Sequence, residues 1–238
     1  MIAALALWQV VTSVGPLADL SIPSVTETAG ALVTEVTTSE FYVRLWETVQ
    51  MAVAGFVIAM AIAIPAGVLI GLSRFAWRST KFTFDFFKVI TPIVIIPIVI
   101  LVLGPTMQMG IFLIVFTLVF AMAIQTGLGV RDADAVLLET MRCYGMSTWK
   151  QIRYARLPSA APFIAVGVRL SASAALVVSI VAGLIGGAPG LGKSILLSQA
   201  AGDDERTFAT VFVLGVLGIL VSRGVTWLQR RSIFWMPT

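Results

Sequence analysis

The chain has 238 residues, of which 58% are hydrophobic and only 12% are charged, about half the charged fraction of an ordinary soluble domain. Its mean hydropathy of +0.99 excludes disordered proteins, coiled coils and most soluble enzymes. Histidine is absent and cysteine occurs once, which removes the commonest metal ligand and general base and any internal disulfide. With so few charges to cover an apolar core, the lipid bilayer is the expected solvent.

Uncharged stretches of spanning length predict six membrane helices, because a helix that crosses a bilayer needs about 20 apolar residues. The stretch at 89–130 is long enough for two helices, divided at Gly104-Pro105. The predicted spans are residues 1–18, 43–73, 82–103, 107–130, 160–185 and 207–228. The fold class is therefore all-α, a polytopic membrane protein in which one transmembrane domain accounts for 1–238. Proline inside an apolar run predicts a kink, here at Pro65, Pro92 and Pro97.

The first stretch, 1–18, is barely long enough to span, and the competing interpretation is a signal peptide. A signal peptide begins with a positively charged region, whereas the first basic residue of this chain is Arg44. We therefore expect a retained first helix. The linker that follows is polar and rich in threonine, and Ser24 to Glu27 predict the start of a short helix on the membrane surface.

The distribution of basic residues predicts which side of the membrane each loop faces. With the N-terminus inside, eleven basic residues fall on inner segments and three, Arg44, Lys193 and Arg206, on outer segments. Inner loops of membrane proteins carry the excess of Lys and Arg, so both termini are predicted to be cytoplasmic. The basic residues form no continuous tract, and no nucleic acid partner is expected.

The longest inner polar segment is the loop at 131–159, between the fourth and fifth spans. Apolar residues within 133–144 recur with the period of an amphipathic helix, and Gly145 follows as a C-terminal cap would. Ser147 is placed to begin a second short, basic helix at 148–156, which leads into the fifth span. Physical reasoning leaves two interpretations open, an interfacial helix on anionic lipid and a docking element for a protein partner.

This loop resembles the EAA loop of ABC importer permeases, whose pattern is Glu-Ala-Ala, three residues, Gly, nine residues, Ile, one residue and Leu-Pro. The residues that match in register are Glu139, Gly145, Leu157 and Pro158. The pattern departs at Thr140 and Met141, which stand in place of the two alanines, and at Ala155 in place of the isoleucine.

The likeness extends over nearly the whole chain and is nearest to the branch that imports taurine, aliphatic sulfonates, nitrate and thiamine precursors. Segments 66–74, 166–170 and 188–192 resemble the end of the family's second span, the start of its fifth and its outer Gly-Leu-Gly turn. The resemblance implies a transport subunit of a bacterial plasma (inner) membrane, not an enzyme, whose substrate is a small polar or anionic solute. It implies no catalytic residue, metal or cofactor in this chain, with ATP and Mg²⁺ on a partner.

The implied partners are a cytoplasmic ABC ATPase dimer, a second permease subunit expected to be identical, an extracytoplasmic solute-binding protein and membrane lipid. In this family the loop carries a coupling helix that inserts into a groove of the ATPase. The residues that the resemblance assigns to this coupling are Glu139, Thr140, Met141, Gly145, Met146, Leu157 and Pro158. ATP binding would then switch the spans between inward-facing and outward-facing states.

Polar residues inside spans are candidates for the substrate pathway, because such groups are costly in lipid. The candidates are Gln125, Arg169 and Ser173, and the guanidinium of Arg169 would suit an anionic substrate. The alternative for the serines of the fifth span is a seam of small residues that packs against another helix. Arg169 could equally bind a lipid headgroup or the EAA-like loop.

Gly187 to Ser194 fits the P-loop pattern G-x-x-x-x-G-K-S, which cradles nucleotide phosphates. A P-loop follows a buried strand, whereas an apolar run of spanning length precedes this segment, and the predicted topology places it outside. A glycine-rich re-entrant turn is the favoured interpretation. A small channel or secondary transporter without an ATPase is the alternative function, and a membrane-embedded enzyme is a third class, disfavoured because His is absent.

Overall fold

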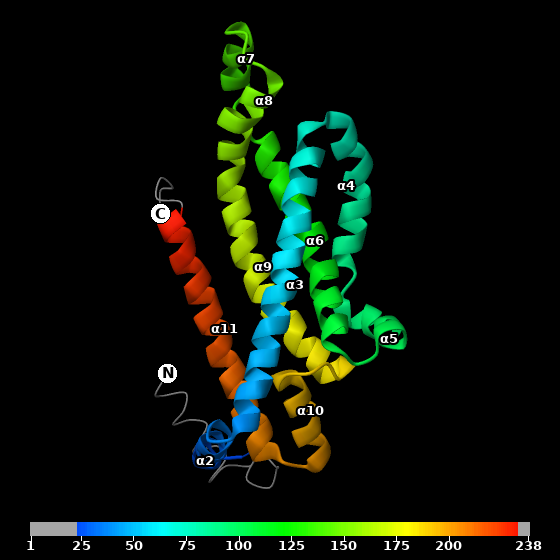
Figure 1. Ribbon diagram of the computed structural model, residues 1–238, viewed down its shortest axis with the longest axis vertical. Coiled ribbons are helices and arrows are strands. Elements are labelled where there is room, and N and C mark those ends of the chain that lie inside the picture. Colours follow the sequence, from blue (N-terminus) through cyan, green and yellow to red (C-terminus); the bar gives the residue numbers. More distant parts are fainter. Residues whose placement is uncertain (1–22, 233–238) are drawn as a thin grey trace, which may run out of the picture.

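The computed structural model describes residues 23–232, and every regular element in that range is a helix (Figure 1). The helices are α2 (Val25–Val36), α3 (Ser39–Leu72), α4 (Arg74–Val89), α5 (Pro92–Leu103), α6 (Met107–Arg131), α7 (Ala135–Cys143), α8 (Thr148–Gln151), the π-helix η1 (Ile152–Arg156), α9 (Leu157–Gly186), α10 (Leu191–Ala201) and α11 (Asp204–Ser232). The all-α class is confirmed for this part of the chain. The span predicted at 1–18 lies outside the described residues.

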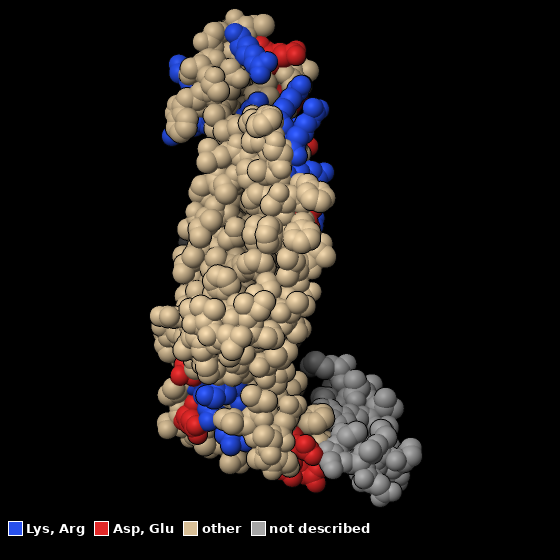
Figure 2. All heavy atoms as spheres, turned by 90° about the vertical axis from the view of Figure 1, so that its right-hand side faces the viewer, with Lys and Arg blue, Asp and Glu red and all other residues tan. Residues whose placement is uncertain are grey.

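Four helices are long and apolar enough to cross a membrane, or five if the bent pair α4 and α5 counts as one span. In Figure 1, α3, α6 and α9 run along the long axis, with α7 and α8 at one end and α2 and α10 at the other. Figure 2 shows charged side chains gathered at both ends of the molecule and an uncharged band between them. This pattern is that of a multi-pass membrane protein.

Glycines bring the backbones of α3 and α6 into contact. A Cβ atom added to Gly67 would lie 2.5 Å from the carbonyl oxygen of Ala123, and one added to Gly71 would lie 2.8 Å from that of Gly127. Gly67 and Gly71 are four residues apart and therefore share one face of α3, as Ala123 and Gly127 do on α6. Small residues at this spacing allow membrane helices to approach closely.

Replacing Gly67 with Leu should push α3 away from α6 and destabilise the fold by about 1–3 kcal/mol, the usual cost of overpacking. The midpoint of thermal unfolding in detergent should fall by roughly 2–4 °C for each kcal/mol. Gly215→Leu is the matched control, because no atom lies within 4 Å of a Cβ atom added at that position of α11. Equal midpoints for the two variants would contradict the importance of the α3–α6 contact.

The segment predicted as a single span at 82–103 is not one continuous helix. The helix starts earlier, at Arg74, and is interrupted after Val89, so that α4 and α5 meet at an angle of 85°. The predicted kink at Pro92 is a complete break, because proline lacks an N–H and disfavours helical backbone in the residue before it. With 16 residues, α4 is about 24 Å long, and α5 lies across its end (Figure 1).

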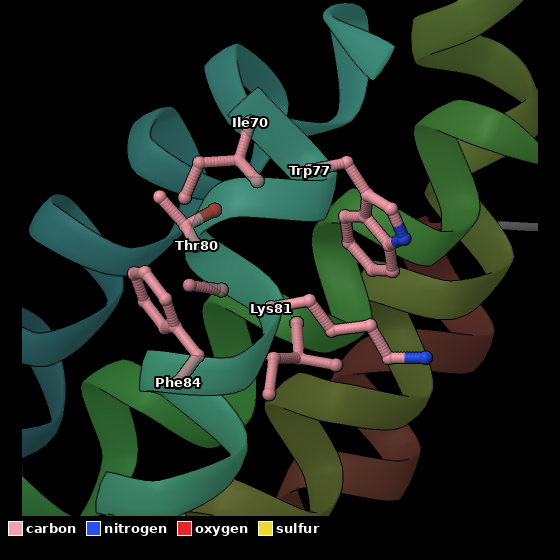
Figure 3. A pocket seen from close by; sticks show the side chains of 7 residues that line it. Ile70, Trp77, Thr80, Lys81 and Phe84 are labelled. Carbon is pink, nitrogen blue, oxygen red and sulfur yellow. The ribbon is translucent and has the colours of Figure 1, made fainter. Parts of the chain in front are cut away.

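Aromatic side chains hold α4 against its neighbours. Phe84 and Phe87 of α4 both contact Phe120 of α6, with ring centroids 5.4 and 5.0 Å apart. Figure 3 shows the small hollow that remains between α3, α4 and α6, beside Trp77 and Phe84. Its volume is about 10 Å³, which is room for about one water molecule.

The short helix predicted near Ser24 is confirmed as α2. Ser24 and Glu27 form a reciprocal capping box, and the backbone and side-chain hydrogen bonds from Ser24 lower the pKa of the Glu27 carboxyl. At the other end of α2, the buried carboxylate of Glu35 pairs with Arg206 of α11 at 2.7 Å. This ion pair ties α2 to the bundle.

Candidate functional site

The loop at 131–159 projects from the bundle as a helical knob (Figure 1). Its first helix, α7, begins at Asp134, whose carboxylate accepts a hydrogen bond from the N–H of Val136 at 2.8 Å. Gly145 ends the turn after α7 with φ +69°, and the N–H of Met146 donates to the carbonyl of Met141 at 3.0 Å. This is the hydrogen bond of a Schellman cap, so the predicted helix and glycine cap are confirmed.

The second helix of the loop starts after Ser147, as predicted, but it does not end before the span. α8 continues through the π-helix η1 directly into α9, and the N–H of Leu157 donates to the carbonyl of Ile152. Pro158 follows in the first turn of α9, where its missing N–H is accommodated by the wider π turn. The knob is therefore joined rigidly to a spanning helix.

The residues that the EAA resemblance assigns to coupling lie together in this knob and at its base. Glu139, Thr140 and Met146 are exposed, and Leu157 and Pro158 are exposed at the start of α9. Met141 is only 7% exposed, so its side chain belongs to the interior of the loop.

Two polar side chains of the knob have defined surroundings, Gln151 in its interior and Glu139 at its edge. The side chain of Gln151 donates to the carbonyl of Met146 at 3.0 Å and closes the turn between α7 and α8. Glu139 lines a cavity of about 530 Å³ between α7 and the ends of α3 and α6.

The three pathway candidates lie in different surroundings. Gln125 on α6 faces Gly167 of α9, where an added Cβ atom would lie 3.2 Å from its Cγ. Arg169 is two residues and about 200° further around α9, on the exposed side of the helix. Ser173 is half-buried, one turn beyond Arg169. The small residues Ser171, Ala172, Ala175 and Ser179 are buried, which agrees with a packing seam.

Gly187 to Ser194 do not form a P-loop, in agreement with the re-entrant turn that the sequence favours. The preceding element is the helix α9 and not a strand. In a P-loop, backbone N–H groups and the serine hydroxyl face the phosphates, but here these groups bond to other parts of the protein. The hydroxyl of Ser194 accepts a hydrogen bond from the guanidinium of Arg44 at 2.7 Å. The N–H of Leu191 donates to the hydroxyl of Thr48 at 2.8 Å. A Cβ atom on Gly192 would collide with α9, so the segment is a tight turn folded back on that helix.

Thr48 is an anchor that the sequence analysis missed. Its hydroxyl accepts from Leu191, and its carbonyl accepts from the hydroxyl of Ser179 at 3.2 Å. It thus joins α3, α9 and α10 at one buried point. Local sequence carries no signal for this role, because the partners are more than a hundred residues away along the chain.

Thr48→Val keeps the side-chain shape and leaves the buried N–H of Leu191 without a partner. The expected loss of stability is about 1–3 kcal/mol, seen as a lower unfolding midpoint in detergent. Thr117→Val on α6 is the control, because that hydroxyl only bonds the carbonyl of Leu113 one turn earlier. If both substitutions have the same effect, the hydrogen bond to Leu191 contributes nothing beyond ordinary helix packing.

Comparison with known proteins agrees with this architecture. Residues 63–233 match the family described as "Binding-protein-dependent transport system inner membrane component", and the chain belongs to that family. It is 26% identical over 231 residues to the aliphatic sulfonates transport permease protein SsuC of Bacillus subtilis, covering 97% of this chain and 84% of SsuC. It is 30% identical to the bicarbonate transport system permease protein CmpB of Synechococcus elongatus, covering 78% and 68% of the two chains.

Among solved structures, an inward-facing methionine ABC transporter, MetNI, shares the fold with a TM-score of 0.70 at 20% identity, over 80% of this chain and 95% of that one. The protein is therefore an ABC importer permease, of the branch to which the sulfonate permeases belong, as the EAA resemblance indicated.

Proposed function

We propose that this chain forms the transmembrane pathway of an ATP-driven importer and that α7 couples it to a separate cytoplasmic ATPase dimer, which binds ATP and Mg²⁺. The observation that carries the proposal is the unbroken course of α8, η1 and α9. A helix transmits displacement along its axis as a stiff rod. Movement of the knob by an ATPase would therefore reach the middle of the bundle through α9 and bias a two-state pathway.

The exposed side of α9 supports a second permease subunit, which we take to be an identical copy. Val166, Leu170 and Val177 are 50%, 65% and 57% exposed, and Arg169 and Ser173 lie on the same side of the helix. Arg169 has no ion-pair partner among residues 23–232. An unpaired guanidinium is costly against lipid, and a water-filled pathway between two subunits removes that cost.

The substrate that suits this pathway is a small anionic solute such as a sulfonate. Two relatives are named for sulfonates and for bicarbonate, both of which are anions, and Arg169 supplies a positive charge within a spanning helix. We place the α7 end in the cytoplasm, because Lys and Arg gather there (Figure 2). Both termini are also cytoplasmic in this proposal, provided that residues 1–18 cross the membrane. An extracytoplasmic binding protein would then deliver substrate to the end that carries α2 and α10.

Glu139→Lys tests the coupling role of α7. The side chain is exposed, so the protein should still fold and reach the membrane. Because the substitution reverses the charge offered to the ATPase, co-purified ATPase and substrate uptake should each fall at least about tenfold, the effect of about 1.4 kcal/mol.

Glu205→Lys is the matched control, since Glu205 is also exposed but lies at the opposite end, on α11. It should leave ATPase retention and uptake unchanged. Wild-type levels of both in the Glu139→Lys protein would refute the coupling assignment and favour a channel or secondary transporter.

A further inference from the structure

Four arginines from four separate elements line the cavity of about 530 Å³ at the base of the knob. They are Arg74 at the start of α4, Arg131 at the end of α6, Arg142 on α7 and Arg156 at the end of η1. Among residues 23–232, Glu139 is the only carboxylate that lines the cavity, so the formal charge of the described lining is +3. We call this cavity the arginine pocket.

The positive charge of the arginine pocket is not neutralised within the described part of the chain. The ion pairs described there involve other residues, at Glu40–Arg44, Asp85–Lys88 and Glu35–Arg206. The guanidinium of Arg131 instead lies over the ring of Trp77, 5.2 Å from its centroid, which fixes its position without removing its charge.

Arg156 is close enough to Arg142 and Arg131 to be repelled by them. Burial, followed by repulsion from Arg142 and Arg131, lowers the pKa of Arg156, which lies in the loop before the span. Bringing several guanidiniums around one cavity is unfavourable unless an anion occupies it.

We propose that the arginine pocket binds the phosphate group of an anionic phospholipid from the cytoplasmic leaflet. Guanidinium groups match phosphate with paired N–H donors, and basic pockets between spanning helices on the cytoplasmic side are suited to lipid headgroups. Only the assignment to the cytoplasmic leaflet rests on the proposed function, through the orientation of the chain proposed there.

The lining explains why a lipid fits better than a soluble anion. Leu72, Val130 and Leu138 also line the pocket, and α3 and α6 end beside it, at Leu72 and Arg131. The pocket thus joins apolar span ends to a cluster of charges, which is the polarity of a phospholipid at the membrane boundary. Such a lipid would bridge α7 to the ends of α3 and α6.

The test is native mass spectrometry of the full-length chain in detergent, with and without its ATPase, titrated with phosphatidylglycerol, with zwitterionic phosphatidylcholine and with inorganic phosphate. We expect one tightly bound phosphatidylglycerol per chain and weaker binding of phosphatidylcholine. The double variant Arg142→Gln/Arg156→Gln should lower phosphatidylglycerol affinity about 30-fold, given the usual contribution of each basic residue to anionic lipid binding.

The control is Arg153→Gln, which removes an exposed charge from η1 that does not line the pocket, and affinity should stay near the wild-type value. If the double variant does not fold, Arg156→Lys replaces it, since lysine keeps the charge and loses the paired donors. The proposal would be overturned if the control and the pocket variants lost phosphatidylglycerol affinity equally. It would also be overturned if the wild-type chain bound phosphatidylcholine as tightly as phosphatidylglycerol.

The remaining outcomes separate the possible sources of the anion. Displacement of the lipid by inorganic phosphate at low millimolar concentration would overturn the lipid source in favour of a soluble anion. A pocket variant that loses the ATPase but keeps phosphatidylglycerol would overturn the proposal in favour of protein docking. The lipid titration is also measured without the ATPase. Lipid binding can therefore be detected even if the proposed coupling of α7 to an ATPase is wrong.

Discussion

The backbone contact between α3 and α6 is the constraint on which the bundle depends. In lipid, apolar side chains gain little by leaving their solvent, so helices associate where small residues let their backbones approach. Gly67 and Gly71 provide that approach on α3. The same device recurs between α6 and α9, where Cβ atoms added to Gly129 and Gly167 would lie 2.7 Å from Phe163 and 2.5 Å from Met122. Three helices are thus locked together. Of the remaining elements, α4 packs alongside α6 and α11 alongside α9, and the shorter helices lie at the ends of the bundle (Figure 1).

The two ends of this core are built for different tasks. At one end, Thr48 and Arg44 fix the first turn of α10 through hydrogen bonds to Leu191 and Ser194, and the Glu35–Arg206 pair holds α2. At the other end, α7 stands away from the bundle on a continuous helix that includes α9. An end held by hydrogen bonds and an ion pair, opposite an end with a projecting knob, suits a protein that is moved from the knob, as the proposed coupling to an ATPase requires.

Local signals in the sequence predicted α7, its glycine cap and α2, because periodicity and capping act over a few residues. Hydropathy could not predict that the helix is interrupted after Val89, because it carries no information on backbone direction. The bend is set by Pro92, where the sequence predicted only a kink. The continuity of η1 with α9 was missed because Pro158 resembles a helix start when read alone. Contacts across the chain, such as that of Thr48 with Leu191, carry no local signal, and the arginine pocket was missed for the same reason.

Purification of the tagged full-length chain from its native host in mild detergent tests the central claim most directly. Quantitative mass spectrometry of the purified material measures which proteins accompany the chain and in what ratio. The account predicts an ABC ATPase subunit at a one-to-one ratio with this chain. Recovery of the chain without any ATPase, from membranes in which its transport activity is intact, would contradict it.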